Sequence, residues 1–201
     1  MSEATTTSEA SAATLEPIRE PMLFLVVLGG RTARSHIELH DVRFVVGRCI
    51  DDTLPELRRQ WFGQRQGLHL DAWMAVRAID GWRVRVVQEV PSAGGLAADL
   101  ARPERLWFVN LGGYRADALA ELHHFGLVVA CSAQAAKAAA KRQWLVGARQ
   151  QHKEDLAAVD DCLVLEQLEL LGGERWAVQL EPHPDGFSQP QVPDWFGYRP
   201  I

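Results

Sequence analysis

The sequence predicts an α+β protein formed by a tandem duplication, in which two β-β-α-β-β units pack as a pseudo-twofold pair. The first observation is a repeat: residues 22–80 align without a gap to the residues 83 positions later, and 17 of these 59 pairs are identical. Unrelated sequences would share only about 4 of them. The second observation is that both copies contain the same order of apolar, helical and turn-forming segments. A unit with one open face or edge buries it most simply against its own copy.

Short motifs recur in the same order in both copies. Each copy begins with an apolar run that closes on two glycines, at 23–30 and at 106–113. Glu-Leu-His follows at 38–40 and 121–123, and Arg-Gln-Trp at 59–61 and 142–144. His69-Leu70-Asp71 aligns with His152-Lys153-Glu154, and beyond the aligned region Trp82 corresponds to Trp176. The second copy therefore carries extra residues after the position that matches Asp80.

The repeat divides the chain into five segments. They are a disordered N-terminal tail at 1–20, a first unit at 21–90, a linker at 91–104, a second unit at 105–181 and a Pro/aromatic C-terminal tail at 182–201. The linker is rich in Pro, Gly and Ser. Four prolines exclude regular structure in the C-terminal tail, and its aromatic residues Trp195, Phe196 and Tyr198 indicate that it packs on the body.

Within each unit, the elements follow from apolar periodicity and turn residues. Leu23–Leu28 and 42–46 are predicted strands, and 54–62 a helix capped by Asp51, Asp52 or Thr53. Residues 68–79 form a strand that turns at Asp80-Gly81 into a strand at 82–87. In the second copy the matching elements are a helix at 133–146 and strands at 162–171 and 176–180. Trp61 and Trp144 are predicted to anchor the two helices on the core.

Composition limits the classes of function. A net charge of −5 disfavours a nucleic-acid-binding protein. The cysteines Cys49, Cys131 and Cys162 form no CxxC pair and are expected to be reduced thiols. The sequence contains neither an apolar run of the roughly 20 residues that cross a bilayer nor a signal peptide, so we expect a cytoplasmic protein, monomeric or homodimeric. It specifies no cofactor, and the partner is an unidentified small molecule or protein.

The succession LxVxLGG, ELH, RQW and HxD resembles an uncharacterised bacterial family, domain of unknown function 1543. The resemblance extends from about Met22 to Leu180 and includes both copies, and the closing segment 195–201 is similar to that family's C-terminal end. It implies tandem copies of one domain. It implies no activity and no catalytic residue.

Two glycine pairs, Gly29-Gly30 and Gly112-Gly113, are candidate ligand-binding positions. Consecutive backbone N–H groups at the end of a strand can form a nest that binds an anion. The alternative is a turn that requires a positive φ angle. We favour the turn, because no phosphate-binding glycine pattern follows either pair.

The sharpest candidate site consists of paired histidines and carboxylates. In an extended segment, residues i and i+2 lie on one side, which pairs Glu38 with His40 and His69 with Asp71. The second copy offers Glu121, His123, His152 and Glu154. Such a set suits a mononuclear metal, with His40, His69, His123 and His152 as candidate ligands, or a carboxylate that orients an imidazole for acid–base chemistry. The favoured alternative is that these side chains make buried hydrogen bonds that hold the fold.

Three functions remain open. The first is a binding module with a pseudo-symmetric cleft for a small ligand or a protein partner. The second is a metal- or His/carboxylate-dependent hydrolase that uses the duplicated pairs, which would have to meet in a cleft. The third, nucleic-acid binding, would require a contiguous basic face.

Overall fold

The structure is a computed structural model, and it describes residues 20–89, 103–113, 117, 119–144, 158–170 and 173–201. Apart from Glu20, the predicted N-terminal tail lies outside the described residues. So do most of the predicted linker and the two candidates His152 and Glu154.

Two helices and a majority of strands make up the described part of the chain. The first unit contains β1 (Met22–Gly30), β2 (Leu39–Gly47), α1 (Ile50–Gln60), β3 (His69–Val76), β4 (Ala78–Ile79) and β5 (Trp82–Gln88). The second contains β6 (Arg105–Gly113), β7 (Leu122–Ala130), α2 (Ala133–Trp144), β8 (Ala158–Val164), β9 (Gln167–Glu169) and β10 (Arg175–Pro182), and β11 (Trp195–Pro200) follows. The predicted α+β class and the repeated β-β-α-β order are confirmed. In this part of the chain no helix is long and apolar enough to cross a membrane.

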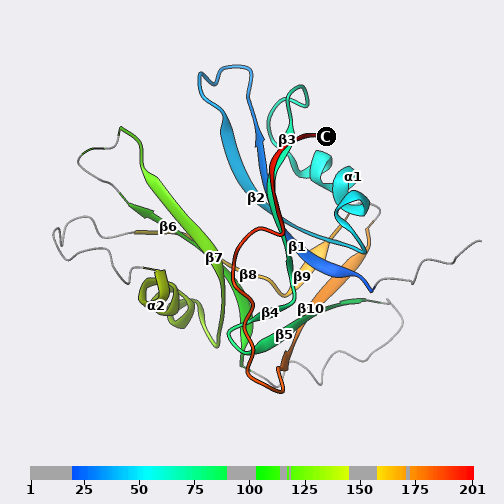
Figure 1. Cartoon of the computed structure of the whole chain (residues 1–201), viewed down its shortest axis with the longest axis vertical. Coiled ribbons are helices and arrows are strands. Elements are labelled where there is room, and N and C mark those ends of the chain that lie inside the picture. Colours follow the sequence, from blue (N-terminus) through cyan, green and yellow to red (C-terminus); the bar gives the residue numbers. More distant parts are fainter. Residues whose placement is uncertain (1–19, 90–102, 114–116, 118, 145–157, 171–172) are drawn as a thin grey trace, which may run out of the picture.

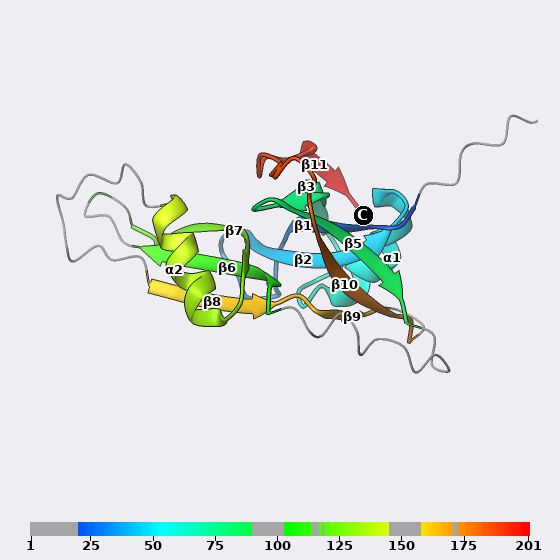
Figure 2. The ribbon, with the colours of Figure 1, turned by 90° about the horizontal axis from the view of Figure 1, so that it is seen from below.

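Each unit builds an antiparallel sheet around its glycine-ended strand. The first-unit sheet has the order β11-β3-β1-β2 and the second-unit sheet the order β7-β6-β8. Helix α1 covers one face of the first sheet and α2 one face of the second, and the two helices lie at opposite ends of the molecule (Figures 1 and 2). The two sheets are thus equivalent, except that β11 extends only the first.

A third sheet joins the units and contains the pseudo-twofold axis. Its order is β4-β5-β10-β9, so the terminal hairpin of each unit contributes two strands. In the antiparallel pairing of β5 with β10, Arg85 stands opposite Gln179. These two residues are equivalent when Trp82 is matched to Trp176, so the strands meet as a symmetry axis requires. This confirms the predicted pseudo-twofold pair.

The strand register corrects the sequence alignment of the two units. Gly29 of β1 pairs with His69 of β3, whereas Gly112 of β6 pairs with Ala158 of β8. Equivalent residues of the two units are 83 positions apart at Gly29 and Gly112 but 89 positions apart at His69 and Ala158. The separation is 94 positions at Trp82 and Trp176. The predicted equivalence of His69 with His152 is wrong, because the extra residues are split between the α2–β8 connection and the β9–β10 turn.

Helix α1 begins at Ile50, four residues before the predicted start, and Cys49 occupies the N-cap position. The carboxylate of Asp52 accepts a hydrogen bond from the backbone N–H of Arg48 at 3.1 Å. This bond is the main reason that the pKa of Asp52 is lowered. Asp51 and Asp52 both lie in the first turn, where the helix dipole favours negative charge. They act inside the helix instead of capping it, so Pro55 lies in the helix interior.

Three apolar clusters divide the core. One lies between the units and combines Leu25, Phe44 and Met74 of the first sheet with Phe108 and Leu127 of the second. A second cluster lies beneath α1 and contains Leu57 of that helix and its C-cap residue Trp61. The third lies beneath α2 and contains Ala136 and Ala140. Each sheet therefore buries one face under its helix and the other against its copy.

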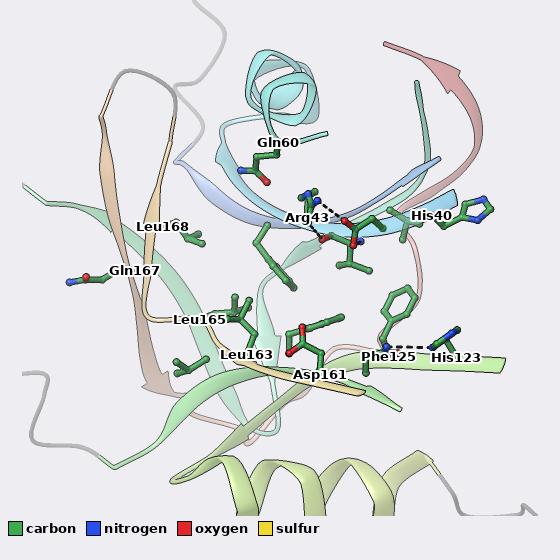
Figure 3. A pocket seen from close by; sticks show the side chains of 17 residues that line it. His40, Arg43, Gln60, His123, Phe125, Asp161, Leu163, Leu165, Gln167 and Leu168 are labelled. Carbon is green, nitrogen blue, oxygen red and sulfur yellow. Dashed lines mark hydrogen bonds and ion pairs between the residues drawn. The ribbon is translucent and has the colours of Figure 1, made fainter. Parts of the chain in front are cut away.

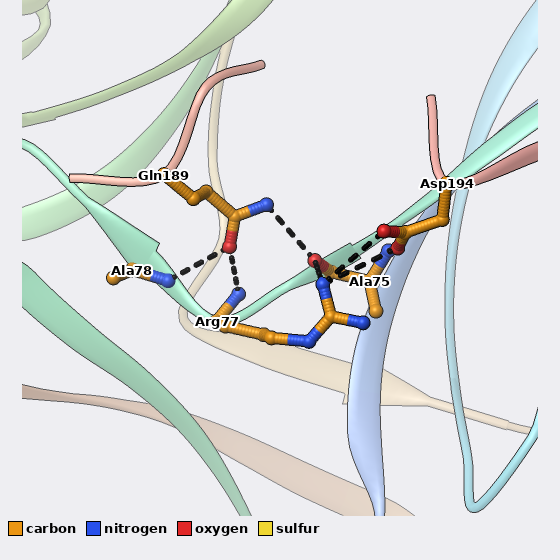
Figure 4. A network of polar contacts seen from close by, with 5 residues as sticks. All are labelled: Ala75, Arg77, Ala78, Gln189 and Asp194. Carbon is orange, nitrogen blue, oxygen red and sulfur yellow. Dashed lines mark hydrogen bonds and ion pairs between the residues drawn. The ribbon is translucent and has the colours of Figure 1, made fainter. Parts of the chain in front are cut away.

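The C-terminal segment ties the two units together before it joins a sheet. Gln189 accepts hydrogen bonds from the backbone N–H groups of Arg77 and Ala78 at 2.6 and 3.0 Å, and Asp194 accepts one from Ala75 at 2.7 Å (Figure 4). Between them, Gln191 bonds both the N–H and the C=O of Leu127 in β7. Residues 195–200 then pair with β3 as β11. The expectation of a segment without regular structure is wrong for these residues, because the prolines precede the strand or end it.

The β4–β5 turn also crosses to the second unit. Asp80 and Gly81 both have positive φ angles, 49° and 81°, as a two-residue Asp-Gly hairpin requires. The Asp80 carboxylate accepts hydrogen bonds from the backbone N–H of Val129, at 2.9 Å, and from Gln143, at 3.3 Å. One aspartate thus forms the turn and joins it to β7 and α2.

Replacing Asp80 with alanine should lower the free energy of unfolding by about 1–3 kcal/mol, because Val129 loses its acceptor and alanine is strained at a positive φ. Urea denaturation measures the loss. The matched control is Asp80→Asn, which tolerates this φ and keeps one acceptor oxygen, and it should lose less. An alanine variant as stable as the original chain would contradict this role.

Candidate functional site

The faces of the two sheets that point away from the helices diverge (Figure 1), and residues of both units line a cleft between them. The cleft has a volume of about 550 Å³. Strand β2 lines one wall, and β6, β7 and β8 line the other (Figure 3). We call it the inter-unit cleft.

The floor of the inter-unit cleft is aromatic and aliphatic. Phe44 of the first unit and Phe108 of the second meet edge to face at 5.3 Å, and Phe108 lies 6.0 Å from Phe125. Leu163 and Leu165 of the second unit complete the floor. Polar residues from equivalent positions of the two units, His40 and His123, line it as well.

In the first unit, the predicted histidines meet over a glycine. Gly29 of β1 pairs with His40 on β2 and with His69 on β3. Residues paired across neighbouring strands point to the same face, so both imidazoles share one side of the sheet with Gly29. A Cβ atom at Gly29 would lie 2.4 Å from His69 Nε2 and 2.8 Å from Asp71 Oδ2. The absence of a side chain is what allows the cluster to form.

A β-bulge brings Asp71 into the same cluster. The register shifts so that Leu28 pairs with Leu70 and Val27 with Ala72, which leaves Asp71 without a partner on β1. Its carboxylate lies between two imidazoles, with Oδ1 3.1 Å from His69 Nε2 and Oδ2 3.2 Å from His40 Nε2. Glu38 lies 3.7 Å from His69 and 3.9 Å from His40. The two His/acid pairs of the first unit therefore meet; we call these four residues the His/Asp cluster.

The two imidazoles of the His/Asp cluster have different surroundings. The side chain of His69 is 1% exposed, whereas that of His40 is 54% exposed. Nδ1 of His69 lies 2.8 Å from the carbonyl oxygen of Gly67, which assigns it the proton. Nε2 lies 3.1 Å from Asp71 Oδ1, a contact that is attractive when this nitrogen carries a proton as well. The buried histidine anchors the cluster, and the exposed one can meet a ligand.

Tyr198 covers the buried side of the cluster, and the sequence did not indicate this. Its ring lies 4.1 Å from that of His69. It falls within the irregular stretch of β11 between Phe196 and Arg199. The tail aromatics were predicted only to pack on the body, and nothing in their spacing points to His69.

The glycine pairs lie within strands, so both sequence interpretations of them are wrong. Gly29-Gly30 and Gly112-Gly113 lie inside strands β1 and β6, and none of the four has a positive φ angle. They therefore form neither a turn nor an anion-binding nest. Gly30 faces α1, where a Cβ atom would lie 2.8 Å from the Trp61 ring. Gly29 makes room for the histidines on one face and Gly30 for the tryptophan on the other.

The second unit retains only part of this arrangement. Gly112 pairs with His123, and Glu121 lies 3.9 Å from that histidine. The position equivalent to His69 is Ala158. His152 and Glu154 lie outside the described residues. In the strands that the structure describes, the two units thus carry different sets of side chains.

The polar residues of the second unit's cleft wall were missed in the sequence. Asn110 stands where the first unit has Val27, and it pairs with Phe125 and Asp161. A polar residue within the apolar run 106–111 was the signal that could have identified it. Asp161 was missed because the ungapped sequence alignment matched it to Ala78. The strand register shows that its counterpart in the first unit is Ala72.

Among the described residues, no group of three or more His, Cys, Asp or Glu side chains is arranged to hold a metal ion. In the His/Asp cluster, the carboxylate contacts the imidazoles directly.

Comparison with known proteins agrees with the duplication. The family described as Domain of Unknown Function (DUF1543) matches residues 35–86 and 118–166, one segment in each unit. The chain belongs to the DUF1543 family. A crystal structure of the protein Il1583 from Idiomarina loihiensis is similar, with 36% sequence identity and a TM-score of 0.65. The similarity covers 90% of this chain and 97% of that one. No curated protein matches the chain. The DUF1543 match assigns no activity to the site.

Replacing Gly29 with alanine should destabilise the first unit by about 1–3 kcal/mol, because the methyl group overlaps His69 and Asp71. A double-mutant cycle with His69→Ala tests this by urea denaturation. The penalty of Gly29→Ala should be smaller when the imidazole is absent. Additive effects would show that the methyl group is accommodated without contact with His69.

Proposed function

We propose that the chain is a binding module whose inter-unit cleft holds a small molecule. The observation that carries this proposal is the cleft itself: about 550 Å³, with an apolar floor and polar groups from both units. Small-molecule sites are concave, mostly apolar and supplied with a few polar groups that fix orientation. His40 and His123, from equivalent positions of the two copies, are such groups.

The test is an NMR fragment screen against the full chain, using small aromatic compounds that each carry one polar substituent. Bound fragments should perturb amide signals of the cleft walls, including those of His40, His123 and Phe125. Leu163→Trp should fill the cleft and weaken binding. The matched control is Leu119→Trp, at a fully exposed leucine outside the cleft lining. Fragments that bind Leu163→Trp as well as the original chain would refute the proposal.

A His/carboxylate-dependent hydrolase is the second candidate, and the His/Asp cluster favours it. A carboxylate that contacts an exposed imidazole can hold the ring in one orientation and favour its protonated form during proton transfer. Asp71 stands in this relation to His40, and His69 fixes Asp71 from the buried side. His40 would then be the acid–base group, and Asp71 and His69 positioning residues.

This candidate predicts hydrolysis of activated esters or phosphate esters that depends on His40. In assays with p-nitrophenyl acetate and p-nitrophenyl phosphate, His40→Gln should lower the rate by about 100-fold or more. The control is His36→Gln, at an exposed histidine outside the cluster. Repeating the assay with a chelator separates a metal-dependent from a metal-independent reaction. Equal hydrolysis rates for His40→Gln and His36→Gln would show that His40 is not the acid–base group and would rule out this candidate.

A further inference from the structure

One charged side chain of the inter-unit cleft faces its floor, and it is negative. The cleft lining contains three charged side chains, those of Asp41, Arg43 and Asp161. Arg43 and Asp41 form an ion pair with each other at 2.5 Å. They pair across the sheet with Val26 and Leu28, which belong to the core beneath α1, so both point away from the cleft floor. Asp161 is the charged lining residue that faces the cleft.

Asp161 of β8 projects its carboxylate into the space between the sheets (Figure 3), and Asn110 of β6 separates it from Phe125 of β7. Oδ1 of Asp161 accepts a hydrogen bond from the backbone N–H of Cys162 at 2.7 Å. No ion pair involves it among the described residues. A carboxylate at the edge of an apolar floor, with no cation paired to it in the described part of the chain, attracts a positive charge.

A second acceptor lies beside Asp161. Asn110 pairs with Asp161 across β6 and β8, and its Oδ1 is buried without a hydrogen-bond partner in the described part of the chain. A ligand that matches this lining supplies hydrogen-bond donors and positive charge.

The aromatic floor fits the same kind of group. Phe125 lines the cleft and is 37% exposed, whereas Phe44 and Phe108, at 8% and 7%, pack edge to face in the core that backs the floor. Ring faces attract cations, and organic ammonium ions are bound in this way by several aromatic side chains together with a carboxylate. The rings also bury the apolar body of such a ligand.

We infer that the ligand of the inter-unit cleft is an organic ammonium ion, held between the Asp161 carboxylate, Asn110 Oδ1 and the ring of Phe125, with Phe44 and Phe108 behind it. This inference deepens the proposed binding function and rests on it. It names the chemical class of the ligand: a compact apolar or aromatic body that carries a primary, secondary or quaternary amine.

The test compares four probes that share one phenyl ring and differ in charge. They are benzyltrimethylammonium and phenethylammonium, 2-phenylethanol, and 3-phenylpropionate. Each is titrated into the full chain at about pH 8, where unperturbed imidazoles are neutral, and followed by the Cys162 backbone amide and the Asn110 side-chain amide. The two cations should bind about tenfold more tightly than the alcohol, and the anion more weakly than the alcohol.

Two variants make the test specific. Asp161→Asn removes the charge but keeps an oxygen for the Cys162 N–H, so the strand should fold. It should cost the cations about tenfold in affinity and leave the alcohol unchanged. Asp185→Asn removes the same charge from an exposed residue outside the cleft lining and should change nothing.

The possible outcomes separate the two claims. An anion or alcohol that binds as tightly as the cations, or cation binding that survives Asp161→Asn, overturns the ammonium ligand while the binding cleft stands. If none of the four probes perturbs the cleft, the proposed binding function and the inference fail together.

Discussion

The sheet of each unit has two apolar faces but only one helix to cover them, and this imbalance governs the architecture. The helix covers one face, so the other must be buried against something else. In this chain the second copy provides the cover, and Leu25, Phe44 and Met74 pack on Phe108 and Leu127. The antiparallel pairing of β5 with β10 holds the two faces opposite each other. Neither unit buries its sheet fully without its copy, so the duplication is required for the core.

The same arrangement explains why a cleft opens between the units. Two twisted sheets that pack closely at one end diverge toward the other, because each has its own right-handed twist. The diverging end of the first sheet carries His40, His69 and Asp71 around Gly29, and the second carries His123 and Asn110. Since both copies contribute to one cleft, a change in either copy alters the shared site. Replacement of the His69 equivalent by Ala158 therefore makes one cleft asymmetric, and it does not create two separate sites.

Much of the fold could be predicted because it depends on local chemistry. The apolar runs, the Asp80-Gly81 turn and the Trp82–Trp176 correspondence each reflect an interaction within a strand or hairpin. The register of β8 could not be predicted, because the identities of Ala75 with Ala158 and Val76 with Val159 extended the ungapped alignment past the true insertion. The meeting of His40, His69 and Asp71 depends on a bulge and on the missing side chain of Gly29, and neither is encoded in the spacing of the pairs. Tyr198 and Asp161 reach the site only through tertiary contacts.

The position of β11 has a consequence for how the chain folds as it is synthesised. This strand completes the sheet of the first unit, yet the contact of Asp194 with Ala75 spans 119 residues. The outer edge of β3 therefore remains unpaired while the entire second unit is translated. Exposed strand edges can pair with other chains, and contacts between distant residues slow folding. The first unit is thus synthesised early but completes its sheet only when the C-terminal strand arrives, and until then the edge of β3 is open to pairing with other chains.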